Sequence, residues 1–126
     1  MRLLEELGSC LFCPEVLLRD PDQKVVWKSD YWAVTPNRYP YAGSRLHLLL
    51  VPWMHATELM ELSDECRNAF WDALSWVKSN YSLDYYGLAS RNGDCTYTGG
   101  TISHFHFHLV VGDPDKSEPV RIRLSS

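Results

Sequence analysis

The chain has 126 residues, a length typical of one domain and sufficient for a hydrophobic core without stabilising disulfides. Sixteen acidic residues against twelve basic ones give a net charge of -4, which argues against a protein that binds nucleic acids through their phosphate backbone. Apolar residues make up 45% of the composition, so a disordered segment is excluded. No apolar stretch approaches the roughly 18 residues of a membrane span, and we expect a soluble, intracellular protein.

The first half of the chain is predicted to form strands, because short apolar runs alternate with turn signals. The predicted strands are residues 25–27, 31–35 and 46–51. The second ends where Pro36 removes a backbone donor. The third is a nearly continuous apolar run before Pro52, the pattern of a buried central strand. A short helical lead over residues 3–7 precedes all three.

One long helix is predicted after Ser63, a residue type that caps helix N-termini, with Asp64 and Glu65 in the favourable first turn. Its apolar positions recur at helical spacing. They are Cys66, Phe70, Ala73, Leu74 and Val77. A short helical turn is predicted before it at residues 58–62, and a further strand after it at 85–90.

Residues 102–111 show the clearest strand pattern in the chain. His104, His106 and His108 alternate with apolar residues, so the three imidazoles are expected on one face of the strand and the apolar side chains against the helix. A last short strand is predicted at 120–124. Several antiparallel strands with one main helix make α+β the expected fold class.

The histidine row is one of two clusters that can carry chemistry. Imidazoles at alternate strand positions repeat about every 6.6 Å, close enough to share a metal or to flank a ligand. The alternative is that they form the polar side of an edge strand. His47 and His55 lie within and just after the apolar run, and a lone histidine there is more often a hydrogen-bonded core residue than a ligand.

The second cluster is the pair Cys10 and Cys13. Two thiolates at Cys-x-x-Cys spacing can bind one Zn²⁺, and two imidazoles would complete a tetrahedral site. A thioredoxin-like redox pair is the rival interpretation, although a turn follows here instead of a long helix. Cys66 and Cys95 are isolated, and Cys66 is expected in the core.

The order of these motifs resembles the histidine triad (HIT) superfamily of nucleotide hydrolases and transferases. The matching segments are the triad 104–110, Gly99-Gly100, the strand 47–52 followed by His55, Asn37, and the opening Cys-Leu-Phe-Cys-Pro at 10–14. Together they cover residues 10–113. The resemblance implies a single HIT domain over 1–126: a five-stranded antiparallel sheet with one long and one or two short helices, usually a homodimer.

The resemblance also implies a reaction. His106 would attack the α-phosphate of a nucleoside phosphoramidate or dinucleoside polyphosphate to form a nucleotidyl-histidine, which water then hydrolyses. His108 and His47 would support the nucleophile. The implied substrate-binding residues are Asn37, Asn92, Gly100 and Thr101.

In zinc-containing members the same resemblance implies a structural Zn²⁺. Its ligands here would be Cys10, Cys13, His55 and His104. All four are protein groups, which leaves no open position for catalysis. A nucleotide is the implied partner and the cytoplasm the implied location, with no membrane or generic nucleic-acid binding.

Three departures from the family pattern bear on substrate choice. Thr101 stands where many members carry Gln, and Val111-Gly112 stands where Pro-Arg often follows the triad. The loop after Asn37 is longer, with Tyr39, Tyr41 and Arg45 available to line a pocket.

Three other functions are considered beside the hydrolase, and the departures motivate the non-enzymatic one. One is a nucleotidyltransferase or phosphorylase of the same superfamily. Another is a non-enzymatic module that binds a nucleotide or a partner. A third takes the histidine row itself as a catalytic metal centre.

Overall fold

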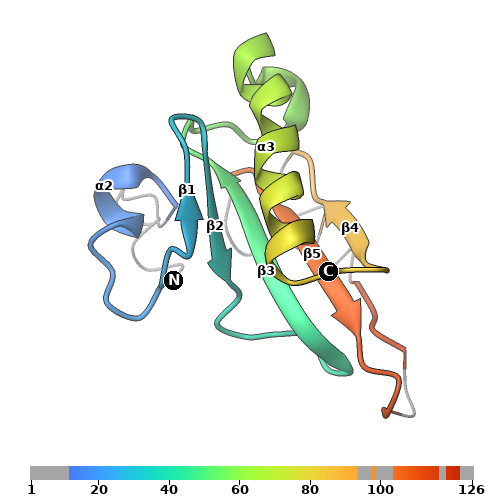
Figure 1. Ribbon diagram of the computed structural model, residues 1–126. Helices are drawn as coiled ribbons and strands as arrows, with labels where there is room; N and C mark the ends of the chain where they lie inside the picture. Colours follow the sequence, from blue (N-terminus) through green and yellow to red (C-terminus); the bar gives the residue numbers. More distant parts are fainter. Residues whose placement is uncertain (1–11, 94–97, 99–103, 117–118, 123–126) are drawn as a thin grey trace.

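A computed structural model describes residues 12–93, 98, 104–116 and 119–122 (Figure 1). Several predicted features lie outside these residues. They are the helical lead 3–7, Cys10, Cys95, Gly99, Gly100 and Thr101. None of the helices in the described part is long and apolar enough to cross a membrane.

Five strands form one antiparallel sheet in the order β1-β2-β3-β5-β4, which confirms the predicted α+β class. The strands are β1 (Trp27–Lys28), β2 (Trp32–Pro36), β3 (Ser44–Pro52), β4 (Gly87–Ser90) and β5 (Phe107–Gly112). The longest, β3, lies at the centre between β2 and β5, and its residues 47–52 are all buried. The apolar run 46–51 therefore predicts the central strand correctly, because only a strand covered on both faces is apolar throughout.

Helix α3 (Asp64–Asn80) lies across one face of the sheet (Figure 1). As predicted, Ser63 caps it: the Ser63 hydroxyl accepts a hydrogen bond from the Cys66 amide at 3.2 Å. Trp32 of β2 ties the sheet to the helix, since its indole N–H donates to the carbonyl of Cys66 at 2.6 Å. Two short helices complete the described elements, α2 (Pro14–Leu17) and the 3-10 helix η1 (Leu59–Glu61).

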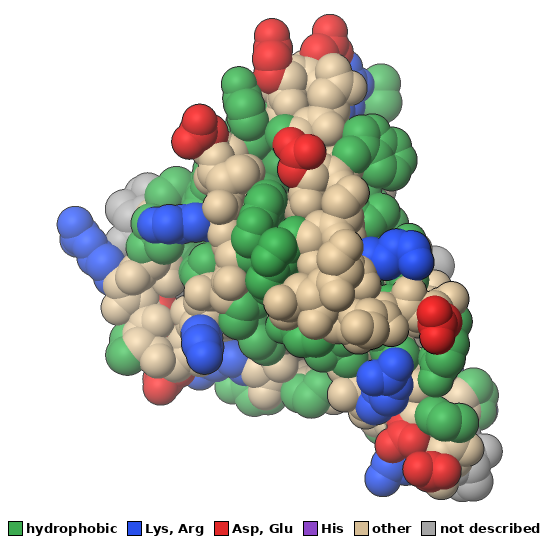
Figure 2. Space-filling view, in the orientation of Figure 1, with side chains coloured by type: hydrophobic (Ala, Val, Ile, Leu, Met, Phe, Trp, Pro, Cys, Tyr) green, Lys and Arg blue, Asp and Glu red, His purple; other side chains and the backbone are tan. Residues whose placement is uncertain are grey.

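The two faces of the sheet carry different side chains. The face under α3 holds the larger apolar cluster, which includes Trp32, Phe105 and Leu109. The other face holds a smaller cluster that includes Phe12 of the N-terminal segment and Leu49. No histidine is visible on the face shown in Figure 2, which looks onto α3. His47 lies two residues from Leu49 on β3 and so shares its face, the one opposite α3.

Several predicted strands differ from the observed ones. The strand predicted at 25–27 begins only at Trp27, and the one predicted at 85–90 begins at Gly87. The strand predicted at 120–124 is wrong for its described part, residues 120–122, which are not paired in the sheet.

The largest difference is at the triad. The strand predicted at 102–111 begins only at Phe107, so His104 and His106 precede it. The reason is a main-chain contact outside the sheet: the Phe105 amide donates to the carbonyl of Ala56 at 2.6 Å. The residues directly before β5 are therefore bonded to the loop that follows β3 and not to a neighbouring strand. As a result, the three imidazoles do not form one straight row.

Candidate functional site

Adjacent strands bring His47 and His108 together on the face of the sheet opposite α3. His108 of β5 pairs with Leu49 of β3, two residues from His47, so the two histidines are diagonal neighbours with the same orientation. Their ring centroids are 5.1 Å apart, and the ring of His106 lies 4.9 Å from that of His108.

The contacts of the His47–His108 pair define where its protons are. The main-chain N–H of Tyr41 donates to Nδ1 of His47 at 3.1 Å, so this nitrogen carries no hydrogen. The proton of a neutral His47 is therefore on Nε2, which lies 2.9 Å from Nδ1 of His108 and donates to it. The proton of a neutral His108 is left on its Nε2.

Both rings are neutral at pH 7. Burial, together with the positive charge of Arg91, lowers the pKa of His47 from 6.5 to about 4. Burial lowers the pKa of His108 further, to about 2, with added repulsion from charge on His106, His47 and Arg91. A neutral imidazole can donate at one nitrogen and accept at the other, as the pair requires.

Tyr41 and Arg91 complete the surroundings of His108. The Tyr41 ring stacks on that of His108, with centroids 5.5 Å apart and planes 18° from parallel. The Arg91 guanidinium donates through Nη2 to the Tyr41 hydroxyl at 3.1 Å and through Nε to the carbonyl of Thr98 at 2.9 Å. Its Nη1 lies 3.1 Å from Nε2 of His108.

His106 has a defined tautomer too. Its Nδ1 lies 2.8 Å from the main-chain carbonyl oxygen of His104, and because that oxygen can only accept, Nδ1 carries the hydrogen. The lone pair is then on Nε2. Burial lowers the pKa of His106 to about 4, and Phe12 packs edge-on against the ring at 5.1 Å. A neutral, oriented imidazole with an unprotonated nitrogen is suited to act as a nucleophile.

Three side chains from distant segments meet as a possible metal site. Sγ of Cys13, at the start of α2, lies 3.4 Å from Nδ1 of His55 and 3.7 Å from Nδ1 of His104. All three ligand atoms lie within 4.8 Å of one another. Cys10, the fourth ligand implied by the resemblance, is outside the described residues.

The donor set of this cluster fits a zinc ion. Nε2 of His104 donates to the carbonyl of Pro52 at 2.6 Å, so its Nδ1 has a lone pair that faces Cys13. A metal-bound histidine usually donates its other ring N–H in this way. Burial lowers the pKa of His104 to about 4, which keeps the ring neutral. One thiolate and two imidazoles are ligands typical of Zn²⁺.

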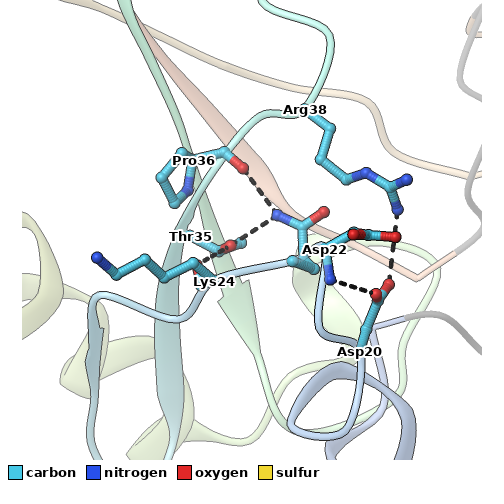
Figure 3. Close-up of polar contacts among 7 residues, drawn as sticks. Asp20, Asp22, Lys24, Thr35, Pro36 and Arg38 are labelled. Carbon is cyan, nitrogen blue, oxygen red and sulfur yellow. Dashed lines mark hydrogen bonds and ion pairs between the residues drawn. The ribbon is translucent and has the colours of Figure 1, made fainter.

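Asn37 lies beside the histidine pair at the end of β2. Its main-chain N–H donates to the carbonyl of His47 at 2.9 Å, and its side-chain nitrogen lies 3.3 Å from Nε2 of His47. The strand end before it is fixed by the buried Gln23, whose side-chain nitrogen donates to the Thr35 hydroxyl and the Pro36 carbonyl, both at 2.7 Å. Figure 3 labels Thr35 and Pro36, which accept these two hydrogen bonds, and the ion pair of Arg38 with Asp20.

The other predicted substrate residues are not brought to the histidines by any contact that the structure describes. The Asn92 side chain accepts from the Leu59 amide at 2.7 Å and donates to the Ser90 hydroxyl at 3.1 Å, which fixes the loop after β4. Arg45, expected near the pocket, lies over the ring of Tyr85 instead. Gly100 and Thr101 fall outside the described residues.

Two residues at the site were missed by sequence reasoning. Arg91 directly follows the predicted strand 85–90, and the antiparallel pairing of that strand with the triad strand could have indicated it. Phe12 lies within the Cys-x-x-Cys segment, where its apolar character gave no sign of a contact with His106. The predicted core role of Cys66 is confirmed, since its side chain is only 1% exposed.

No protein-family model matches the sequence, and no curated protein matches it either. Solved structures do match. A HIT family hydrolase from Clostridium thermocellum superposes with a TM-score of 0.67 at 20% identity, over 89% of this chain and 96% of the other. A histidine triad nucleotide-binding protein from Candida albicans gives 0.68 at 19% identity, over 90% and 87%. The fold is the histidine triad fold.

A third structure with the HIT fold bears on the cysteine–histidine cluster. It is described as a Zn-bound histidine triad family protein from Mycobacterium smegmatis. It superposes with a TM-score of 0.66 at 18% identity, and the match covers 92% of this chain and 83% of the other. The superpositions of these three structures establish a shared fold.

Proposed function

We propose that the protein is a nucleotide hydrolase that acts at the α-phosphate of nucleoside phosphoramidates or dinucleoside polyphosphates. The observation that carries the proposal is the tautomer of His106: the His104 carbonyl holds the proton on Nδ1 and leaves the Nε2 lone pair for attack. The neighbouring structures described as a hydrolase and as a nucleotide-binding protein support the same class of function.

The reaction has two displacements at phosphorus. Nε2 of His106 forms a bond to the α-phosphorus while the bond to the leaving amine or phosphate breaks, and the leaving group takes up a proton. Water then attacks the nucleotidyl-histidine, the P–N bond breaks, and the nucleoside monophosphate leaves with His106 neutral again. In the proposal His47 and His108 keep the neighbouring donors oriented, and Asn37, Asn92, Gly100 and Thr101 bind the nucleotide.

The test is the variant His106→Asn assayed with adenosine 5′-phosphoramidate. We expect no release of AMP by the variant, because its side chain has no nucleophilic nitrogen, while AMP binding persists. Wild-type protein quenched in acid during turnover should carry radiolabel from the adenosine moiety, and the variant should carry none. Undiminished turnover by the variant would refute the mechanism.

A transferase of the same fold is the alternative, and it differs only in the acceptor of the nucleotidyl group. Adding inorganic phosphate or a sugar phosphate to the assay distinguishes the two. A nucleotidylated acceptor in place of the monophosphate identifies a transferase. Tight AMP binding without turnover of any nucleotidyl compound identifies a non-enzymatic module instead.

We propose that Cys13, His55, His104 and Cys10 hold a structural Zn²⁺. The ion would tie the N-terminal segment to the start of β5 and add to the stability of the fold. The Zn-bound neighbour and the orientation of His104 support this proposal. A thiolate site also suits a reducing compartment, so we place the protein in the cytoplasm.

The variant Cys13→Ala tests the metal site, with Cys66→Ala as a matched control in which a buried thiol is also removed. We expect about one zinc per chain in the wild type and the control by elemental mass spectrometry, and none in Cys13→Ala. A chelator should lower the Tm of the wild type and of Cys66→Ala, and leave the Tm of Cys13→Ala unchanged. Zinc that remains when both Cys10 and Cys13 are replaced by Ala would place the metal on the histidine row.

We further propose a homodimer formed at the β4 edge of the sheet. β4 is the outer strand beside β5, and Leu88 on it is 38% exposed. Together with Trp71 of α3, which is 63% exposed, it lines a groove over the larger apolar cluster. A second copy would pair along the strand and cover these side chains.

A further inference from the structure

Tyr41 is held in place through its main chain. Its amide donates to Nδ1 of His47 at 3.1 Å. Its carbonyl accepts from the amide of Ser44 at 3.1 Å and from the Ser44 hydroxyl at 2.6 Å. Gly43 lies in the turn between them with φ 86°, in the left-handed region that favours glycine. The loop after Asn37 therefore fixes Tyr41 at one position beside the histidines.

The side chain of Tyr41 covers the histidine pair. Its ring centroid lies 4.2 Å from that of His47, and the ring stacks on that of His108 at 5.5 Å, with planes 18° from parallel. Stacked rings attract each other, and each limits the rotation of the other. The hydroxyl accepts from Nη2 of Arg91 at 3.1 Å and lies 3.5 Å from Nδ1 of His108. One side chain therefore contacts β3, β5 and the residue that follows β4.

This position differs from the one that the sequence suggested, in which Tyr41 lines a substrate pocket beside Tyr39 and Arg45. The ring of Tyr39 is 66% exposed and lies beneath Arg38, and Arg45 lies over the ring of Tyr85. Of these three side chains, only Tyr41 has a contact with the histidines in the part of the chain that the structure describes. Its contacts are those of a support for the histidines.

His108 is the histidine whose orientation this support affects most. Its Nδ1 must point at Nε2 of His47, from which it accepts at 2.9 Å. Its ring also lies 4.9 Å from that of His106, the proposed nucleophile. A displacement of about 1 Å next to reacting atoms can lower a rate about 100-fold. Loss of the stacked ring at Tyr41 would therefore reach the reaction through His108.

We propose that Tyr41 is a positioning residue, whose side chain holds the ring of His108 and the guanidinium of Arg91 in the arrangement that attack by His106 requires. The inference rests on the proposed function. Tyr41 acts through these neighbours and does not touch the reacting atoms. Its side chain should therefore matter for kcat, while the KM for a nucleotide substrate should change little.

The variants Tyr41→Leu and Tyr41→Phe test the proposal with adenosine 5′-phosphoramidate as substrate. Leucine removes the planar ring, so kcat should fall about 100-fold. Phenylalanine keeps the stacked ring and loses only the contact with Arg91, so kcat should fall by about 3- to 10-fold, the range for one hydrogen bond. Tyr31→Leu is the matched control, because Tyr31 precedes β2 and is 42% exposed. Its kcat should equal that of the wild type.

NMR spectra of the protein without substrate measure the position of His108 directly. A stacked aromatic ring shifts the carbon-bound protons of the imidazole, so Tyr41→Leu should lose this shift and Tyr41→Phe should keep it. In both variants the nitrogen-15 spectrum should still show the His47 proton on Nε2, because the main-chain amide of residue 41 is unchanged. This signal shows that the loop is still in place.

Two results would overturn the proposal. One is a Tyr41→Leu protein with its loop in place and the kcat of Tyr31→Leu. The other is a rise in KM without a loss of kcat, which would make Tyr41 a substrate contact. If leucine displaces the loop, Tyr41→Phe decides: a smaller loss of kcat than in Tyr41→Leu supports the proposal, and an equal loss with unchanged His108 signals refutes it.

Failure of this inference can be told from failure of the proposed function. A wild type that releases no AMP from the phosphoramidate refutes the hydrolase. The NMR comparison then decides whether Tyr41 holds His108: loss of the shift in Tyr41→Leu supports the support by Tyr41, and unchanged His108 signals refute it. If the wild type is active and Tyr41→Leu is equally active, only the positioning proposal fails.

Discussion

Main-chain atoms set the proton positions of three histidines. The Tyr41 amide fixes His47, the Pro52 carbonyl fixes His104, and the His104 carbonyl fixes His106. Each contact leaves one ring nitrogen with a known role as donor or lone pair. The residue types could be predicted from the sequence, since His-x-His-x-His is a specific pattern, but the tautomers depend on loops that no pattern describes.

The neutral pair makes the fold sensitive to acid. The folded-state pKa values of His47 and His108, about 4 and about 2, lie below 6.5, so the unfolded chain takes up protons first as the pH falls. The free energy of unfolding should therefore be fully retained above pH 6.5 and decline below it. At pH 5 the expected loss is on the order of 2 kcal/mol per ring.

Urea unfolding at pH 7.5 and pH 5 measures this loss. We use the Cys13→Ala background, so that release of a metal at low pH does not contribute. His47→Asn in that background is the comparison. On unfolding at low pH it should take up about one proton fewer, so its free energy of unfolding should fall less steeply as the pH is lowered. Equal pH dependence of the two proteins would show that His47 is not the titrating group.

At the scale of elements, the predicted strands match the observed ones where an apolar pattern determines the strand. They are wrong where main-chain groups of the segment bond to a loop instead of to a neighbouring strand. The central strand and the capped helix were predictable because burial on both faces and a Ser63 cap leave clear signals. The start of β5 was not, because the Phe105 amide bonds to Ala56, a contact between segments almost fifty residues apart. Arg91 was missed for a similar reason: its partners come from three other segments.

Gln23 joins the segment before β1 to the end of β2, directly before Asn37. Gln23→Ala removes two hydrogen bonds from a buried position, so we expect a loss of about 1–3 kcal/mol in the free energy of unfolding. If Asn37 binds the ribose, the KM for a nucleotide substrate should rise while kcat changes little.

The neighbouring variant Asp22→Ala is the control for this change. Asp22 is exposed, and its replacement should alter stability by no more than about 0.5 kcal/mol in urea unfolding. A Gln23→Ala protein as stable as the control would show that the buried amide does not hold the strand end.

At the scale of the whole molecule, the sheet separates two functions onto its two faces. The helix face carries the main core, and the histidines and the cysteine–histidine cluster lie on the opposite side. The sequence predicted this division for His108 and the apolar residues of β5, because alternating residues of one strand must point to opposite faces. His104 and His106 precede the strand. The sequence could not predict how far the catalytic histidine candidates lie from the cysteine–histidine cluster, because this distance depends on the path of residues 104–106.

The proposed dimer gives a prediction at this scale. Trp71→Glu places a charge in the groove beside β4, and we expect it to convert a dimer to a monomer in light scattering coupled to size exclusion. Leu18→Glu is the matched control, because Leu18, the C-cap residue of α2, is 50% exposed and lies away from β4. A wild type that is monomeric at micromolar concentration would contradict the dimer.

His104 takes part in both clusters through different atoms. Its ring faces Cys13, while its carbonyl oxygen orients His106. A carbonyl belongs to every amino acid, so no substitution at position 104 deletes it. Selection, or an experimenter, can therefore alter the proposed metal site at this position and leave in place the group that orients the His106 ring.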